Sequence, residues 1–471
     1  MVDSTKQVEQ VQGVLIEGVF GKDVDVKFDA ENQSSDGGAL LIGGLDYTLG
    51  ISNLIAGAID DRRQKSKIEY ELVELIRMRV YGLCCGYQDG LDADKLRNDP
   101  MFKFLCAKNV DKEELASSST LCRLENILTK RDLFRIGNAL LNWQLEHQRR
   151  IRPNRVRLVT VDLDPTDDPA YGQQQFTFFN AHYDNYVYLP LLAFVTFHDE
   201  HGCEEPEQYL VGAVLRPGNV APSIGAKGTL RMICQRLRTL FPGVTIRVRM
   251  DGGFATPEML EFLEMLRVSY LVNLPPNSIL RTLAASYMRQ AQELSQRSGN
   301  SERVYGECEY AAGTWKKKRR VIIKAEVLVH NVRGDKDNLR FVVTNISPTA
   351  DPERLYAHTY CLRGDAENRI KEMHEMALGR TSCESFWANQ FRVLLSAAAY
   401  MLMQELRRRT GDNDLQRAQV PRLRETLLKL GATVRQVTRK LYVSMPDSAV
   451  FAHVWCSIAS SMGNPYIMQP G

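Results

Sequence analysis

Apolar and polar residues alternate over five segments in the middle of the chain, and this period of two predicts β-strands. The first segment begins at Arg155 and carries Asp162 and Asp164 on one side. Further strands are expected at Tyr186–Phe197, Gln208–Leu215, Val244–Met250 and Tyr270–Leu274. Helical spacing lies between the last three strands, over Ser223–Leu240 and from Thr256 to Leu266. Three strands before the first helix predict an antiparallel meander that continues into a parallel α/β part.

The flanking segments follow other patterns. Residues 11–50 alternate short β-like runs with turns rich in Gly and Asp, and helical spacing then extends from Ile68 to about Gln148. This start is either a small helical DNA-binding unit or a plain helical bundle. After a helical piece at Ile279–Arg297, a β-rich insertion is expected, with strand-like runs at Arg303–Tyr310, Arg320–Val329 and Arg340–Thr344.

Two helices and a basic, strand-like tail are expected after the insertion. They cover Asp351–Leu378, Phe386–Arg408 and Leu427–Met445. The predicted organisation therefore has five parts. These are a β and helical region at 1–150, the first part of an α/β core at 151–275, the insertion at 276–352, core helices at 353–410 and a basic region at 411–471.

Composition identifies a folded protein and argues against a membrane or exported one. Of the 471 residues, 44% are hydrophobic and 25% are charged, which is ordinary for a globular chain. No apolar run approaches the roughly 18–20 residues that span a bilayer, and the first ten residues lack the apolar part of a secretion signal. The ten cysteines form no C-x-x-C pair, which fits buried, reduced thiols in the cytoplasm.

Charge is unevenly distributed, although the formal net charge is only +3. Residues 1–50 carry a net charge of −6, and residues 405–440 carry +6. Five arginines fall between Arg149 and Arg157, and a second basic cluster follows Trp315 directly: Lys316, Lys317, Lys318, Arg319 and Arg320. Each cluster alone fits a solvated surface, whereas several on one chain favour a polyanionic partner such as DNA.

Isolated acidic residues at strand ends are the first candidates for chemistry. Asp162 and Asp164 end the first strand, and Asp251 ends the fourth, directly before Gly252 and Gly253. Strand ends are where α/β sheets present ligands, and glycine allows close approach of a backbone or substrate. The alternative is that each Asp only begins a turn.

A second candidate lies on the helix after the insertion, where Arg363, Glu367, Lys371 and His374 share one polar face. The alternative is a surface helix with ion pairs. Two strand-end aspartates and a helical glutamate together suit Mg²⁺, which prefers carboxylate oxygens. Two such ions about 4 Å apart can assist in-line displacement at phosphorus.

Four sequence runs together resemble the DDE transposases of bacterial insertion sequences. They are Asp162–Pro169, Arg216–Asn219, Asp251–Phe254 and Arg363–Asn368. The chain is similar more narrowly to the branch with a Tyr-x2-Arg-x3-Glu-x6-Lys signature, and within it to the insertion-sequence family numbered 1380. This resemblance implies an RNase H-like (retroviral-integrase-like) catalytic core with a β-rich insertion, plus a mainly helical N-terminal region.

The resemblance also implies roles for single residues. Asp251 matches the second catalytic carboxylate and Glu367 the third; Asp164 is favoured as the first because Asp-x-Thr is usual in this branch, with Asp162 as the alternative. Tyr360 and Arg363 match the first two signature positions, and His374 stands where Lys is expected, with Lys371 as a substitute.

The basic cluster gains an implied role too. In related transposases an aromatic residue of the insertion stacks on a flipped base, which suggests this role for Trp315 with Lys316–Arg320 on the DNA backbone. A core tryptophan at a hairpin is the alternative.

The implied activity is metal-dependent cleavage of element ends and strand transfer into target DNA, with two Mg²⁺ (or Mn²⁺) ions. The implied partners are the terminal inverted repeats, bound by region 1–150, target DNA, and a second copy in a paired-end complex, in a nucleoid-associated setting of the bacterial cytoplasm. Two alternatives stay open: an RNase H-like nuclease or resolvase without strand transfer, and a non-catalytic DNA-binding repressor derived from a transposase.

Overall fold

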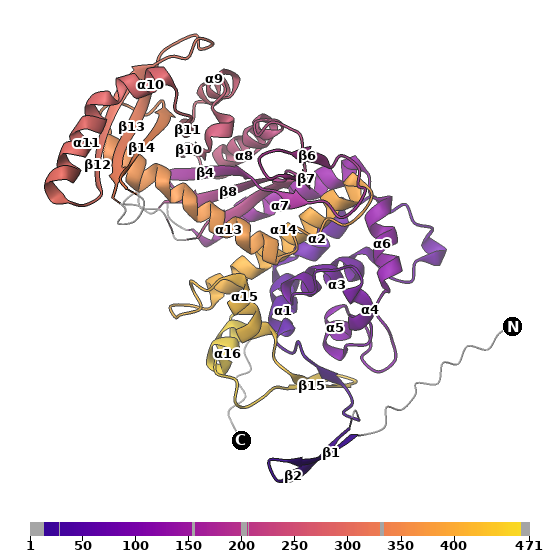
Figure 1. The fold of residues 1–471 in the computed structure, drawn as a ribbon. Coiled ribbons are helices and arrows are strands. Elements are labelled where there is room, and N and C mark those ends of the chain that lie inside the picture. Colours follow the sequence, from indigo (N-terminus) through magenta and orange to yellow (C-terminus); the bar gives the residue numbers. More distant parts are fainter. Residues whose placement is uncertain are drawn as a thin grey trace.

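A mixed eight-stranded sheet forms the centre of the computed structural model, which describes residues 14–27, 29–152, 156–198, 205, 207–329 and 334–462 (Figure 1). The strand order is β12-β13-β14-β11-β10-β4-β8-β9. Five of these strands are β4 (Leu158–Pro165), β8 (Leu191–Phe197), β9 (Tyr209–Val214), β10 (Thr245–Met250) and β11 (Ser269–Leu274). The start of the first predicted strand, Arg155, lies outside the described residues.

The pairing of these five strands confirms the predicted meander and parallel part. β8 pairs antiparallel with both β4 and β9, whereas β10 pairs parallel with β4 and with β11. Leu158–Leu163 of β4 pair with Thr245–Met250 of β10 in register, so both strands end at one edge of the sheet. This edge brings together side chains that are about 90 positions apart in sequence.

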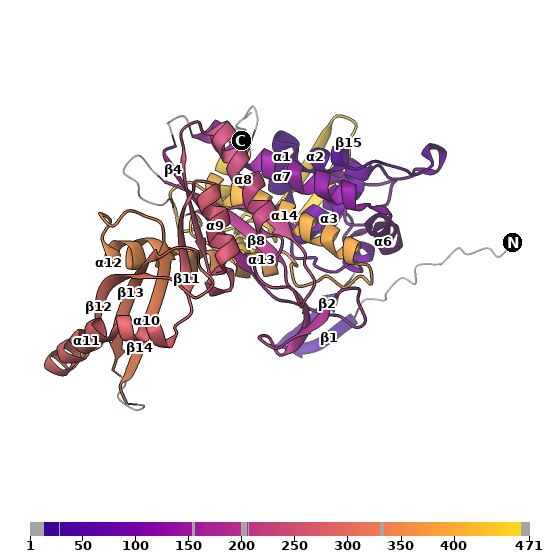
Figure 2. The same cartoon turned by 90° about the horizontal axis from the view of Figure 1, so that it is seen from above.

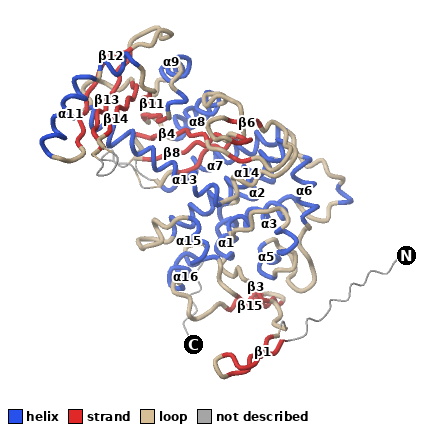
Figure 3. Tube along the Cα trace, viewed as in Figure 1, coloured by secondary structure: helices blue, strands red, loops and turns tan. Residues whose placement is uncertain are grey.

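Helices cover both faces of the sheet. On one face, Val159, Val161 and Leu163 pack with α8 (Ala226–Leu240) and α9 (Pro257–Met265) in a continuous apolar core. On the other face, β8 and β9 contribute apolar side chains to a core shared with α13 (Gly364–Glu375) and α14 (Phe386–Arg409). Figure 3 shows the strands enclosed between these helices. The sheet is therefore buried on both faces, which suits its apolar strands.

The insertion extends the main sheet. Its elements are α10 (Ser278–Leu283), α11 (Ala285–Ser298), β12 (Glu302–Tyr310), β13 (Arg319–Leu328) and β14 (Lys336–Thr344). β14 pairs antiparallel with β11, and β13 joins β14 to β12. Figure 2 shows these strands at one end of the molecule, far from α6. Three strands thus lie where the sequence predicted strand-like runs, and they continue the central sheet.

The N-terminal and C-terminal parts pack together around α14. The first part contains β1 (Val14–Val19), β2 (Lys22–Val26), β3 (Gln33–Ser34), α1 (Ala39–Leu49), α2 (Ile51–Ala58), α3 (Leu72–Cys84), α4 (Asp92–Leu96), α5 (Pro100–Leu105), α6 (Ser118–Ile127) and α7 (Lys130–Ile151). The last part contains α15 (Val420–Leu423), β15 (Ala432–Val437), β16 (Lys440–Ser444) and α16 (Ala452–Ser460). β3 pairs with β15, so the two ends of the chain meet in one small sheet.

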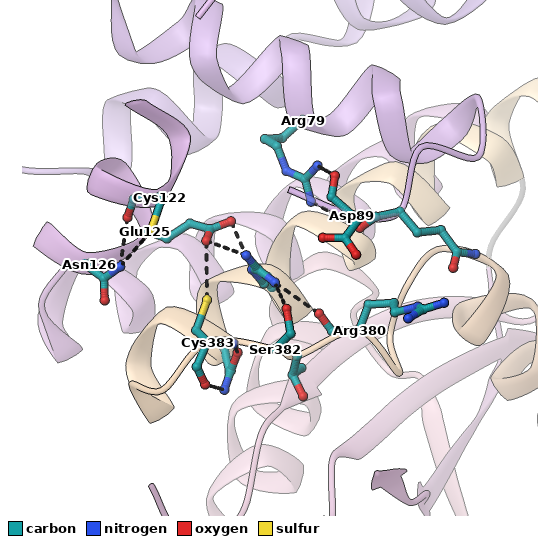
Figure 4. A network of polar contacts seen from close by, with 12 residues as sticks. Arg79, Asp89, Cys122, Glu125, Asn126, Arg380, Ser382 and Cys383 are labelled. Carbon is teal, nitrogen blue, oxygen red and sulfur yellow. Dashed lines mark hydrogen bonds and ion pairs between the residues drawn. The ribbon is translucent and has the colours of Figure 1, made fainter. Parts of the chain in front are cut away.

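A polar network fastens the N-terminal helices to the rest of the chain (Figure 4). Arg392 of α14 donates to Glu125 of α6 through Nε at 3.0 Å and Nη2 at 2.9 Å. It also donates to Ser382 Oγ at 2.7 Å, and the Cys383 thiol lies 3.4 Å from Glu125 Oε2. Because Glu125 is buried, loss of Arg392 would leave an uncompensated charge between the two parts.

Three predicted elements differ in the structure. Residues 39–58 are helical, although 11–50 had been expected to hold only short β-like runs. The strand expected at Tyr186–Phe197 is two strands: β7 (Asn185–Tyr188) pairs with β5 (Asp168–Pro169) and β6 (Phe178–Asn180), and β8 begins after Pro190, which lacks an N–H for pairing. The helix expected over 351–378 begins as α12 (Pro352–Leu355) and passes through a π turn at Tyr356–Tyr360 and a tight turn at Cys361–Arg363 before α13.

Among the described residues, no single helix is long and apolar enough to cross a membrane; α1 and α2 pass that test only as a pair bent by 58°. The nine described cysteines are all free thiols.

Candidate active site

The parallel pairing of β4 and β10 places two candidate carboxylates at one edge of the sheet. Met250 and Leu163 form the last pair between β10 and β4, so Asp251 and Asp164 each come directly after that pair. Asp251 caps the turn at Gly252–Phe254, and its Oδ1 accepts the Gly253 N–H at 2.9 Å. A Cβ on Gly253 would lie 2.6 Å from Pro222 Cγ, so only glycine fits the turn that holds Asp251.

Arg363 connects Asp164 with Glu367. Its Nη1 donates to Asp164 Oδ2 at 2.7 Å, and its Nη2 donates to Glu367 Oε1 at 3.3 Å. The Asp164 side chain is 11% exposed, whereas that of Glu367 is 57% exposed. The turns before α13 thus bring the third candidate carboxylate to the strand ends, one helical turn after the arginine.

The charges of Asp251 and Glu367 both act on the carboxyl group of Asp164. Burial raises the pKa of Asp164 to about 7; the Arg363 charge opposes this rise, and the negative charges of Asp251 and Glu367 add to it. Burial also raises the pKa of Tyr360, with Arg363 lowering it and Asp251 raising it. Arg363, Asp251 and Glu367 therefore act on Asp164, and Tyr360 interacts with Arg363 and Asp251.

Asp162, the alternative first carboxylate, is already paired. Its Oδ1 and Oδ2 accept hydrogen bonds of 2.7 Å from Nε and Nη2 of Arg249, and both side chains are fully buried. Arg249 Nη1 donates to the Thr359 carbonyl at 2.8 Å, directly before Tyr360. This arrangement favours Asp164 over Asp162 as the ligand-binding carboxylate, because Arg249 occupies both oxygens of Asp162 whereas Arg363 contacts Asp164 at Oδ2.

The two residues considered for the last signature position lie in different surroundings. His374 Nε2 is 3.2 Å from Thr166 Oγ1, and burial lowers the pKa of the imidazole, so it is neutral at pH 7. Lys371 is exposed on the same helix. A permanent positive charge at the strand ends comes instead from Arg363.

Two further residues near the carboxylates had no role in the sequence reasoning. The pKa of Tyr183 is raised by burial and by the charges of Asp167, Asp164 and Asp251. Burial lowers the pKa of Arg216 to about 10, while Tyr183 and Asp251 act in the opposite direction.

Arg216 is held in the bend that leads to α8. Its guanidinium donates to the carbonyls of Leu189, Pro222 and Ile224, and its Nη2 is buried with no hydrogen-bond partner among the described residues. The only signal in the sequence was its place in the Arg-Pro-Gly-Asn run.

The carboxylates suit a hard divalent cation by their chemistry. In the described part of the chain, no group of three or more His, Cys, Asp or Glu side chains stands in an arrangement that could hold a metal ion, and Arg363 contacts both Asp164 and Glu367. Mg²⁺ is commonly held by one or two carboxylates together with water and substrate phosphate. The pKa of Asp164 is raised chiefly by burial, and the charges of Asp251 and Glu367 add to the rise; a cation bound there would favour the charged carboxylate. The residues therefore fit Mg²⁺ or Mn²⁺.

The structure favours the core alternative for Trp315. The indole is 9% exposed, its ring lies 5.5 Å from that of Tyr310, and the Arg319 guanidinium lies 5.1 Å from its centroid. Such a buried ring packs the base of the insertion and has no open face for a nucleobase.

Most of the basic cluster beside Trp315 contacts acidic residues of the same chain. Lys316 pairs with Glu261 at 2.9 Å, Lys317 and Arg319 pair with Glu264 at 3.0 and 2.8 Å, and Arg320 pairs with Glu307. The side chains of Lys316 and Lys317 remain 81% and 59% exposed, and Lys318 is exposed as well, whereas Arg319 and Arg320 are largely buried. Only the three lysines present charge to solvent.

Comparison with known proteins identifies one family. Residues 16–464 match the family model described as transposase DDE domain group 1. No curated protein matches the chain.

Proposed function

The chain belongs to the transposase DDE domain family, and on this premise we propose that it cuts the ends of an insertion sequence and joins them to target DNA. We place it in the branch with the Tyr-x2-Arg-x3-Glu-x6-Lys signature, in the family numbered 1380. The strand order β9-β8-β4-β10-β11, antiparallel and then parallel, supports an RNase H-like core.

The observation that carries this proposal is the contact of Arg363 with both Asp164 and Glu367 beside Asp251. Three carboxylates from two strand ends and one helix surround a single guanidinium. A structural ion pair needs one acidic partner, whereas this site gathers three and leaves Glu367 exposed to solvent. We assign Asp164, Asp251 and Glu367 as the catalytic, metal-binding residues.

The bound metal, Mg²⁺ or Mn²⁺ as two ions, would supply Lewis-acid stabilisation of charge at the phosphorus centre and at the attacking and leaving oxygens. Asp164, Asp251 and Glu367 would hold it. Three neighbouring carboxylates repel one another unless positive charge lies between them. Without a bound metal, Arg363 supplies that positive charge to Asp164.

Arg363 is the residue that we expect to contact the DNA phosphate. A guanidinium forms paired hydrogen bonds with phosphate as readily as with carboxylate, so it can turn from Asp164 to a bound strand once cations neutralise the acids. Tyr360 lies beside it and would position the same phosphate through its hydroxyl. Lys371 and His374 lie further along this helix, the lysine toward solvent and the histidine against Thr166.

DNA is the proposed substrate, as the terminal repeats of the element and as target DNA. Cleavage would use water as the nucleophile, and joining would use the freed 3′-hydroxyl. Because two ends must be joined together, we propose a homodimer on paired ends in the bacterial nucleoid. The exposed Lys316, Lys317 and Lys318 are candidate backbone contacts.

The test is an incubation of the full-length chain with labelled end DNA, an unlabelled target and Mg²⁺, with both strands mapped at nucleotide resolution. Nicks at the end of the repeat, followed by joined products, are expected. Nicks without joined products would indicate a nuclease, and binding without nicks in Mg²⁺ and in Mn²⁺ would indicate a repressor; either result contradicts the proposal.

A further inference from the structure

The β1–β2 hairpin projects from the rest of the molecule (Figure 1). One of its faces carries exposed apolar side chains. Val14 pairs with Val26 and Ile16 pairs with Val24, so these four β-branched side chains share one face. Val14, Ile16 and Val24 are 54%, 47% and 38% exposed. An isolated two-stranded hairpin is marginally stable in water, so such a face calls for a partner.

The opposite face of the hairpin is polar and acidic. Leu15 pairs with Asp25 there, and Asp23 lies one pair further along β2 on the same side. The two strands carry three acidic residues, Glu17, Asp23 and Asp25, against Lys22, and Lys27 directly after β2 pairs with the exposed Asp25 at 2.7 Å, which leaves residues 14–27 with a net charge of −1. This charge disfavours DNA as the partner of the hairpin and favours a basic protein surface.

The sheet formed by β16, β15 and β3 has the complementary pattern. β16 lies at its edge, with its outer backbone groups unpaired among the described residues. Leu441 and Val443 of β16 face the apolar core, whereas Lys440 and Tyr442 share the outer face with Arg435. β16 and β2 each have five residues; apolar and polar positions alternate along β16, and they alternate in β2 from Asp23 to Val26.

We propose that β2 of one copy pairs with the open edge of β16 in a second copy, so that the hairpin extends the partner's small sheet. Edge pairing would continue the apolar face from Leu441 and Val443 onto Val24 and Val26. On the other face it would set Asp25 among Lys440, Tyr442 and Arg435. A single register of the paired strands therefore gives apolar contact on one face and contact between opposite charges on the other.

β2 can pair more readily with β16 of a second copy than with β16 of its own chain. The hairpin leaves the body at β3, which is the edge of the small sheet opposite β16, so within one chain it would have to fold back across the sheet. The hairpin and β15 lie at the same end of the molecule (Figure 1). A two-fold axis at that end lets both hairpins dock reciprocally. The choice of a second copy rests on the proposed function, which needs two copies at two DNA ends.

Sedimentation velocity of the full-length chain, without DNA or metal, tests the contact. The wild-type chain is expected to be dimeric, and Ile16→Asp should raise the dimer dissociation constant by more than about tenfold because it puts a charge on the docked face. Leu15→Asp is the matched control. Leu15 is the neighbour of Ile16 on β1, its side chain is 57% exposed and lies on the acidic face, so this substitution should leave the dimer intact. A monomeric wild-type chain, or a dimeric Ile16→Asp variant, overturns the proposal.

Charge reversal separates contact between copies from contact within one copy. Lys440→Glu and Asp25→Lys should each weaken the dimer about tenfold. A mixture of the two variants should form a heterodimer, because each hairpin then meets an opposite charge in the other copy. If dimerisation recovered only in a chain that carries both Lys440→Glu and Asp25→Lys, and not in the mixture of the two single variants, the contact would lie within one copy and the proposal would be overturned. The Glu367→Gln variant should sediment as the wild type, so failed catalysis and failed dimerisation are distinguished.

Discussion

Arg249 and Asp162 form a fully buried ion pair with two hydrogen bonds of 2.7 Å, each two positions before a candidate catalytic aspartate, Asp251 and Asp164. They face each other across the paired strands β10 and β4. Because Arg249 also donates to the Thr359 carbonyl, one side chain fixes both strand ends and the turn that carries Tyr360 and Arg363. The pair therefore positions the site without taking part in the chemistry.

We expect Asp162→Asn to destabilise the chain by about 3–5 kcal/mol, because it leaves the buried Arg249 charge uncompensated. Urea unfolding measures this change. Lys316→Gln, which removes an exposed ion pair, is the control and should change stability by less than about 1 kcal/mol. Similar small losses in both variants would show that the buried pair does not bear on the stability of the strand ends.

Glu367→Gln should abolish cleavage and joining together while end binding persists. The side chain is 57% exposed, so the change should leave the melting temperature nearly unchanged. Asp365→Asn is the matched control, since Asp365 is an exposed acid two positions earlier on α13, and this variant should remain active. Product mapping on labelled end DNA reads both steps. Cleavage by Glu367→Gln would remove this residue from the catalytic set, and loss of joining alone would imply separate sites.

The stability of the chain should fall as the pH rises toward 8 because of Asp168. Burial raises its pKa to about 7; the Thr381 hydroxyl, which donates to Oδ2 at 2.5 Å, opposes this rise, and the Asp167 charge adds to it. A carboxyl whose pKa is higher in the folded chain stabilises the fold below its unfolded pKa near 3.8, and this contribution is lost as the pH rises through 7.

Asp168→Asn removes this titration. We expect the variant to gain stability relative to the wild type between pH 5 and 8 by about 3 kcal/mol, since the pH rises by about two units before it reaches the folded pKa of about 7, at 1.36 kcal/mol per unit. Urea unfolding at a series of pH values measures the difference, with Asp365→Asn as the control. A difference between variant and wild type that is constant over this range would contradict the expectation.

Replacing Lys316, Lys317 and Lys318 by Gln should weaken DNA binding for every sequence and reduce its salt dependence. Each phosphate contact contributes a slope of about 0.9 in log affinity against log salt. Arg319 and Arg320 are left unchanged because both are largely buried in ion pairs. Lys95→Gln, which removes an exposed and ion-paired lysine of α4, is the control. Unchanged affinity and slope would return the cluster to a solvated surface.

The sequence by itself determined the elements of this fold. Side-chain alternation within β4 and β10, the helical spacing of α8 and α9, and the three strands of the insertion are local properties, because each depends on residues a few positions apart. The breaks at Pro190 and in the turns before α13 were missed, since the apolar pattern continues through them while the backbone changes course.

Only the tertiary structure decided which acidic residues stand together and which are already paired. Asp162 and Asp164 have the same strand, face and side chain, yet Arg249 binds the first and Arg363 the second. The partners are 87 and 199 positions away in sequence, so no local pattern distinguishes them. Trp315 likewise became a core residue only in the folded chain, where it joins the apolar core that the central strands share with α8 and α9. Periodicity in the sequence predicts the face of a strand or helix on which a side chain lies. The charged and apolar groups that contact it on that face belong to other segments, which only folding brings near.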